Sequence, residues 1–126
     1  NNWKRAVAEY QNLEKRVAQE RKDWIRQANR ELLLRLLPVF DTLMLAEKHL
    51  QDEGVSLVVK QFLDVLQAEG VERVEAAGRV FDPKLMECVN AVPGEENKVV
   101  EETRIGFTIY GQVLRPAQVK VGKGEE

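Results

Sequence analysis

The first fifty residues contain no glycine and only one proline, Pro38, so this region favours one long helix. Large apolar side chains recur there at intervals of seven: Trp3, Tyr10, Val17 and Trp24. A helix of about 45 residues would be ~70 Å long at ~1.5 Å per residue. No small domain could cover so long an apolar stripe, so we expect a second copy of the chain to pack along it.

The companion position of this heptad has a mixed character. It is occupied by Ala6, Leu13, Glu20, Gln27 and Leu34. Polar side chains at such a position weaken a coiled coil, because the partner helix would have to bury them. The sequence therefore predicts helix pairing that is real but weak.

Beyond Leu32 the apolar face becomes wider, which is typical of a helix bundle. Pro38 predicts a bend, and residues 51–54 predict the break before a second helix over 56–69, with Ser56 as its N-cap. The side chains expected to face inward on that helix are Leu57, Phe62, Leu63 and Leu66. Two helices per chain, doubled by dimerisation, give four. The expected dimerisation residues are Trp3, Tyr10, Leu13, Val17, Trp24, Leu33, Leu37, Phe40 and Leu63.

After Gly70, a suitable residue to end that helix, the apolar period changes to two. Strands are predicted at 71–74, 85–92, 99–105, 107–110 and 113–121. A turn or a one-turn helix start is predicted at Asp82-Pro83, a bulge at Gly106 and an edge at Pro116. The expected fold is α+β. A helical dimerisation region covers residues 1–70, a small hairpin-rich β domain covers 71–122, and 123–126 form a loose tail.

Composition argues against several functional classes. The net charge is −2, and the basic excess is confined to residues 1–50, where ten Lys and Arg face seven Asp and Glu in an interleaved order. We interpret this excess as a solvated helix face rather than a nucleic-acid surface. No apolar run approaches the roughly 20 residues that span a bilayer. The single cysteine, Cys88, fits a reducing compartment and is expected to be a buried structural thiol.

Residues that could perform chemistry are scarce. His49 is the only histidine, at a helix end, and Ser56 is the only serine. One His and one Cys cannot form a His/Cys metal site, so we expect no metal and no cofactor. Gly106 and Gly111 have the spacing of a phosphate-binding loop, but Gln112 follows where Lys is required. The chain is therefore not expected to be an enzyme.

Five sequence motifs, in order, resemble those of the GrpE family, the nucleotide exchange factors of DnaK chaperones. They are AEYQNLEKR (8–16), LLPVFDTLMLAE (36–47), the glycines at 54 and 70, FDPKLMECV (81–89) and GFTIYGQVLRPAQVKV (106–121). The resemblance covers essentially the whole chain. Three positions depart from the family pattern: Met86 replaces His, Cys88 replaces Ala and Gln112 replaces Arg.

The resemblance implies a parallel homodimer with paired long helices, a four-helix bundle and two β domains. It also implies a cytoplasmic co-chaperone of protein folding and the heat-shock response. Such a protein binds the DnaK ATPase domain, favours its open cleft and speeds ADP release. The residues placed at the DnaK contact by this resemblance are Gly54, Phe81, Pro83, Gln112, Leu114 and Arg115. Among them, Arg115 is the expected hot spot.

Two other functions are compatible with the pattern. The first is a dimeric coiled-coil scaffold whose β domain binds some other protein. The second is a nucleic-acid-binding protein that uses the basic N-terminal helix, which would bind with a strong salt dependence. The first differs from an exchange factor only in whether the β domain engages a chaperone ATPase domain.

Overall fold

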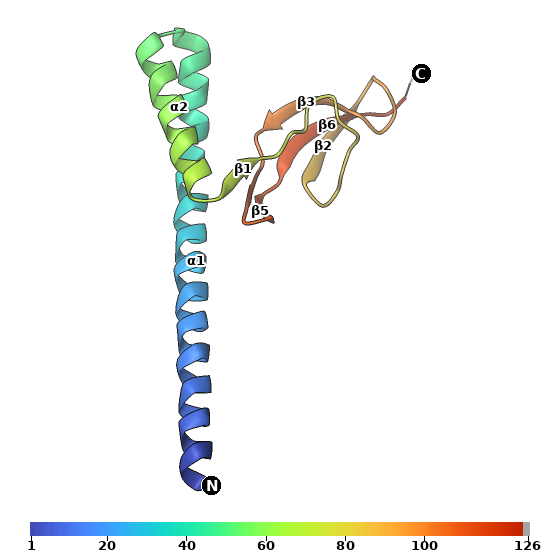
Figure 1. The fold of residues 1–126 in the computed structure, drawn as a ribbon. Coiled ribbons are helices and arrows are strands. Elements are labelled where there is room, and N and C mark those ends of the chain that lie inside the picture. The colour runs from blue at the N-terminus through green and yellow to red at the C-terminus, as the bar shows by residue number, and fades with distance from the viewer. Residues whose placement is uncertain (125–126) are drawn as a thin grey trace. The chain divides into compact units, whose positions relative to one another are not determined.

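The computed structural model describes residues 1–124, which form two helices followed by six short strands (Figure 1). This arrangement confirms the predicted α+β fold. The chain divides into two compact units, Asn1–Leu33 and Leu34–Glu126. The predicted change from helix to strand near residue 70 is found between Ala68 and Val71. We refer to residues 71–124 as the β region.

Helix α1 (Asn2–Leu50) is continuous through Pro38, as expected for a segment with no glycine. The Asn1 side chain accepts a hydrogen bond from the Trp3 N–H at 2.9 Å and so caps the first turn. Lys48 and His49 lie in the last turn, where positive charge is favourable to the helix dipole. Within residues 1–124, no helix is both long enough and apolar enough to cross a membrane.

Helix α2 (Glu53–Ala68) begins earlier than predicted, and its N-cap is Asp52 rather than Ser56. The Asp52 carboxylate accepts a hydrogen bond from the Gly54 N–H at 2.6 Å. Gly54 therefore lies inside the first turn of α2, and the break falls at Gln51, where φ is +49°. Gly70 has φ of +82° and follows the C-cap, which confirms its predicted role.

The two helices form an antiparallel pair, in which α2 runs back beside the C-terminal part of α1 (Figure 1). The buried side chains are Leu37 and Phe40 on α1 and Val59 and Leu66 on α2. Leu57 and Leu63, which were expected to face inward, are 56% and 37% exposed in this chain. Only part of the apolar surface of α2 is thus covered by α1.

The first sheet consists of β1 (Val71–Arg73), β4 (Phe107–Ile109) and β5 (Gln112–Arg115), in the order β1-β4-β5. All its pairs are antiparallel. A two-residue turn joins β4 to β5, with positive φ at Tyr110 and Gly111. Turns of this kind match the twist of a hairpin, so this part of the predicted hairpin is confirmed.

The second sheet has the order β2-β6-β3 and contains β2 (Met86–Val92), β3 (Val99–Arg104) and β6 (Ala117–Gly122). Strand β6 is central, parallel to β2 and antiparallel to β3. Its core combines inward side chains of the strands with residues of the loop after β1. The core residues are Val74, Ala76, Met86, Val99, Ala117, Val119 and Val121, and Phe81 and Leu85 pack against them.

The prediction of one strand over 113–121 is wrong, because Pro116 divides it into β5 and β6, which belong to different sheets. Of these two strands, β5 is at the edge of its sheet and β6 is central. Gly106 is not a bulge within a strand but lies between β3 and β4, and a Cβ there would overlap the backbone of Ala117. The chain crosses between the sheets at both places, so two backbone segments meet where no side chain fits.

Two smaller predictions for the β region are corrected. Cys88 is exposed rather than buried, and its Sγ donates to the Asn90 carbonyl at 3.4 Å beside a register shift in β2. The tail predicted to be loose is hydrogen-bonded in its first half: the N–H groups of Lys123 and Gly124 donate to Val92 and Gly94. Glu125 and Glu126 lie outside the described residues. The turn predicted at Asp82-Pro83 is confirmed by the Lys84 N–H donating to Asp82 Oδ1.

Candidate functional site

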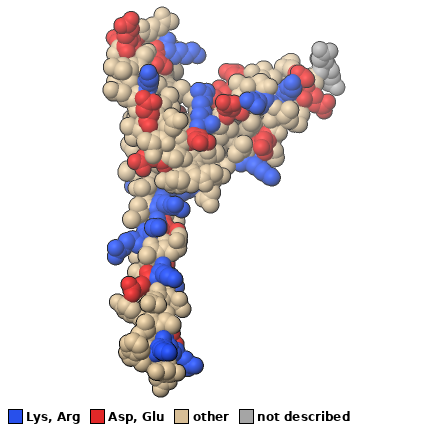
Figure 2. Space-filling model, in the orientation of Figure 1, with Lys and Arg blue, Asp and Glu red and all other residues tan. Residues whose placement is uncertain are grey.

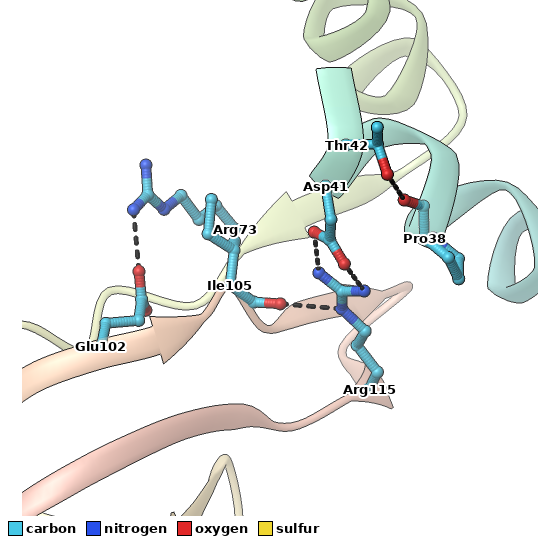
Figure 3. Close-up of polar contacts among 7 residues, drawn as sticks. All are labelled: Pro38, Asp41, Thr42, Arg73, Glu102, Ile105 and Arg115. Atoms are coloured by element: carbon cyan, nitrogen blue, oxygen red, sulfur yellow. Dashed lines mark hydrogen bonds and ion pairs between the residues drawn. The ribbon is translucent and has the colours of Figure 1, made fainter. Parts of the chain in front are cut away.

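Arg115, the last residue of β5, is bound to Asp41 on α1 (Figure 3). Its two terminal nitrogens donate to the two carboxylate oxygens of Asp41 at 2.7 and 2.6 Å. Its Nε donates to the Ile105 carbonyl at 2.8 Å, in the loop between β3 and β4. One side chain thus joins the helix, the end of β5 and the crossing between the two sheets.

This ion pair is largely shielded from water: the Arg115 side chain is 6% exposed and that of Asp41 is 33% exposed. A two-bond contact between guanidinium and carboxylate is stronger and more directional than a single hydrogen bond. Removing one partner of a buried pair costs roughly 3–5 kcal/mol, because the other charge is left without a partner. We expect the lower end of this range here, since Asp41 keeps some contact with water.

Three aromatic rings lie beneath the ion pair. The Phe40 ring meets Phe62 of α2 edge to face, with ring centroids 4.8 Å apart. On its other side Phe40 approaches Phe107 of β4 at 6.2 Å. The Arg115 guanidinium lies 5.6 Å from the centroid of the Phe107 ring, a geometry that attracts a cation. The rings therefore connect α2, α1 and the first sheet through side chains next to Asp41 and Arg115.

Two further polar contacts appear near this junction (Figure 3). Thr42 Oγ1 donates to the Pro38 carbonyl at 3.2 Å, one turn back along α1. Arg73 on β1 donates to Glu102 on β3 at 2.9 Å and so joins the two sheets. Because Glu102 is only 9% exposed while Arg73 is 54% exposed, the acid is held at the sheet junction and the Arg covers it from the solvent side.

The predicted DnaK-contact residues differ in accessibility. Pro83, Gln112 and Gly54 are exposed, and Phe81 is half-buried against the core of the second sheet. Leu114 and Arg115 are 4% and 6% exposed in this chain. Burial of Leu114 follows from its inward position on β5, and burial of Arg115 from its contact with Asp41. Their contact with DnaK, which the family resemblance implies, stays a prediction.

The predicted dimerisation residues also fall into two groups. Trp3 and Trp24 are 72% and 71% exposed, and the other members before residue 30 are exposed as well. Leu33 is half-buried and Leu63 is on the exposed side of α2. Leu37 and Phe40, in contrast, are buried within this one chain, so α2 and β4 already account for their apolar character.

Asp41 is the functional candidate that the sequence analysis missed. Its signal was present: it is a lone carboxylate in the apolar run LLPVFDTLML, directly after the buried Phe40. A charge at such a position requires a partner, because an unpaired buried carboxylate is costly. Arg115, the only Arg between residues 105 and 126, was the available partner, but 74 residues separate the two in sequence.

His49 and the charged surface are the other polar features that the sequence singled out. His49 is exposed in the last turn of α1, as predicted. Among residues 1–124, no three His, Cys, Asp or Glu side chains gather as a metal site would require. Basic and acidic side chains are interspersed along the face shown in Figure 2. This mixture agrees with the interpretation of a solvated helix face.

Comparison with known proteins gives a consistent result. The sequence model of the GrpE family matches residues 1–123. The chain is 35% identical to Protein GrpE of Porphyromonas gingivalis, covering 94% of this chain and 68% of that protein. It is 36% identical to Protein GrpE of Methanothrix thermoacetophila, covering 94% and 67%. For Protein GrpE of Brachyspira hyodysenteriae the identity is 36%, covering 98% and 68%. The chain therefore belongs to the GrpE family of co-chaperone nucleotide exchange factors.

Proposed function

We propose that this chain binds the ATPase domain of a DnaK-type chaperone, favours its open cleft and so speeds ADP release. The observation that carries the proposal is the match to the GrpE family over residues 1–123, which includes both helices and nearly all of the β region. The process it would serve is cytoplasmic protein folding, including the response to heat stress.

The physical requirement for exchange is differential binding. A partner opens a cleft only to the extent that it binds the open state more tightly than the closed one. A 1000-fold gain in the open population needs roughly 4 kcal/mol of such preference. A standard interface of about 800 Å² per partner is large enough to supply it.

The docking surface we propose lies on the exposed and half-exposed predicted residues. Phe81 and Pro83 stand at the turn before β2, and Gln112 begins β5. Gly54 lies in the first turn of α2, where an added Cβ would approach Asp52 Oδ1 at 3.1 Å. Leu114 and Arg115 would support this surface from below rather than touch the chaperone.

We also propose that the chain works as a parallel homodimer. The support is the apolar stripe of α1, whose Trp3, Tyr10 and Trp24 side chains are more than 60% exposed in the single chain. Large apolar patches of this kind are uncommon on monomers and mark contact surfaces. The same contact would extend to Leu13, Val17, Leu33 and the exposed side of Leu63. The polar side chains of Glu20 and Gln27 would keep the pairing of the two helices weak.

Release of a fluorescent ADP analogue from a DnaK-type chaperone, followed by stopped flow with and without the chain, tests the proposal. We expect acceleration by orders of magnitude that saturates with the concentration of the chain. Gln112→Arg, which restores the residue of the family pattern, should increase the acceleration, and Asn29→Arg on α1 is the matched control. If the dimer forms but release is unchanged, the chain is a scaffold whose β region binds another protein.

A further inference from the structure

We propose that Asp41 and Arg115 are positioning residues for nucleotide exchange: their buried ion pair fixes the first sheet against α1. In this role neither residue touches the chaperone. The inference rests on the proposed function, because it concerns how the same docking surface is held. It replaces the expectation that Arg115 is a contact residue with a role for which its geometry is better suited.

The hydrogen bonds of Arg115 are already directed inward. All three of its side-chain nitrogens donate within the chain, two to Asp41 and one to the Ile105 carbonyl. These bonds use three of the five guanidinium N–H groups, and the side chain is only 6% exposed. A chaperone group could contact the whole guanidinium only if Arg115 left its position over Phe107 and gave up these bonds. Such a rearrangement would leave the Asp41 charge unpaired, so direct contact is the less favourable use of Arg115.

Besides the chain connection and the contact of Phe40 with Phe107, the ion pair of Asp41 with Arg115 holds this junction. The β region is joined to α2 through Gly70, whose φ of +82° marks a sharp turn. Apolar contact is not directional, so the approach of Phe40 to Phe107 tolerates small rotations of one ring past the other. The planar two-bond contact of Arg115 with Asp41 does not tolerate such rotations, because both hydrogen bonds require a fixed angle.

The same junction borders a cleft in which such a rotation would show. Asp41 and Leu45 of α1 line one side of it, and Thr103 and Ile105 line the other, around a volume of about 350 Å³. A tilt of the β region about the Gly70 connection would widen or close this space at little cost in apolar contact. The ion pair lies at its edge, because Asp41 is one of the lining residues.

Rigidity at this junction matters for exchange because the partner must discriminate between two states. A β region held at one angle to α1 would fit the chaperone when its nucleotide cleft is open. It would have to distort in order to bind the chaperone when that cleft is closed. If it moved freely, it would follow the chaperone in either state and would lose the preference that drives opening, even with every surface contact intact. Loss of the ion pair should therefore reduce the limiting rate of ADP release more than it reduces affinity.

The test measures ADP release by stopped flow over a range of concentrations of the full chain. Asp41→Asn keeps the shape of the side chain and removes its charge, and Arg115→Lys keeps the charge and removes the planar fork. We expect each variant to lower the limiting rate about tenfold or more and to change the half-saturating concentration less than about threefold. The paired exchange of Asp41→Arg with Arg115→Asp should restore part of the rate. Glu101→Gln, which removes the exposed pair with Lys120 in the β region, is the control.

A second readout does not depend on activity. Spin labels at the exposed Cys88 and at His49→Cys report the distance between the second sheet and the end of α1. Labelled chain is diluted with an excess of unlabelled chain, so that the distances measured lie within one chain. A narrow distribution that broadens in folded Asp41→Asn supports the proposal, and an unchanged distribution overturns it.

The kinetic outcomes separate the possible failures. A raised half-saturating concentration with an unchanged limiting rate in Arg115→Lys would make Arg115 a contact residue and overturn the inference. An unchanged limiting rate in both single variants, with their folds intact by circular dichroism, would also overturn it. Absence of acceleration by the unmodified chain would contradict the proposed function instead, and the spin-label distances would then decide the positioning role alone.

Discussion

Trp24 and Phe40 lie on the same helix, yet Trp24 is 71% exposed and Phe40 is 1% exposed. The two compact units, Asn1–Leu33 and Leu34–Glu126, differ in the same way. In the second unit, α2 and β4 contact part of the apolar stripe of α1 and bury Phe40, whereas the first unit consists of that stripe and the polar face behind it. Helix propensity forms both halves, but within residues 1–124 only the second contains buried side chains.

This difference separates two kinds of stability. The free energy of unfolding of the packed unit should depend on its own core. As long as the dimer is preserved, it should not change with protein concentration. The stability of the exposed helix should depend on the association of two chains and therefore on concentration. Matched variants in the two halves should therefore differ in their effects.

Phe40→Ala should lower the free energy of unfolding of the packed unit by about 3–5 kcal/mol, because it leaves a cavity between Phe62 and Phe107. Urea denaturation at a fixed chain concentration, followed by circular dichroism, measures this change. Trp24→Ala is the matched aromatic deletion on the exposed half. It should leave the packed unit within about 0.5 kcal/mol of the unmodified chain and weaken self-association. Equal losses in the two variants would mean that the two halves are not distinct.

Gly106→Ala should destabilise the β region by about 1–3 kcal/mol, because the new methyl group overlaps the backbone of Ala117. Gly78→Ala separates this overlap from backbone strain: Gly78 has φ of +76° and nothing within 4 Å of its added Cβ. We expect a loss of about 1 kcal/mol there. Hydrogen exchange of the β6 amides provides the measurement, and a larger loss for Gly78→Ala would refute the close approach at Gly106.

Gln27→Leu should tighten self-association about tenfold, because it places an apolar side chain at a polar position of the predicted seam. Sedimentation equilibrium of the full chain gives the dissociation constant. Asn29→Leu removes an exposed amide two residues away, outside the seam, and is expected to leave the constant unchanged. Similar tightening in both variants would show that general hydrophobicity, rather than the seam, drives association.

Asp52→Ala should cost about 1 kcal/mol through loss of the cap on the Gly54 N–H. Ser56→Ala serves as the comparison, since Ser56 lies inside α2 on an exposed face and was the residue that the sequence favoured as the cap. We expect little change from it in thermal unfolding followed by circular dichroism. If Ser56→Ala were more destabilising than Asp52→Ala, α2 would begin at Ser56 instead.

The sequence predicted the elements that depend on local patterns. A run without glycine indicated α1, the period of two indicated β2 and β3, and Gly70 indicated the end of α2. It failed where distant segments decide the structure. Pro116 divides two strands because β5 and β6 pair with different partners, and the parallel pairing of β2 with β6 has no local signal.

The candidate site follows the same division. Exposure of Pro83 and Gln112 agrees with their turn and strand-start positions, which are local features. Arg115 is buried because it pairs with Asp41, and a contact between residues 74 positions apart leaves no periodic pattern in the sequence. From the sequence alone, a lone Arg near a proline therefore resembles a surface residue, because its partner Asp41 lies far away on α1.

We propose that the chain acts on a DnaK-type chaperone by preferring its open, nucleotide-free state. The most direct measurement is the dissociation constant of the full chain for that chaperone, without nucleotide and with saturating ADP, by isothermal titration calorimetry. Because coupling is reciprocal, the ratio of the two constants must equal the factor by which the chain weakens ADP binding. We predict a ratio of orders of magnitude in favour of the nucleotide-free chaperone. Equal constants would contradict exchange activity and leave only a binding scaffold.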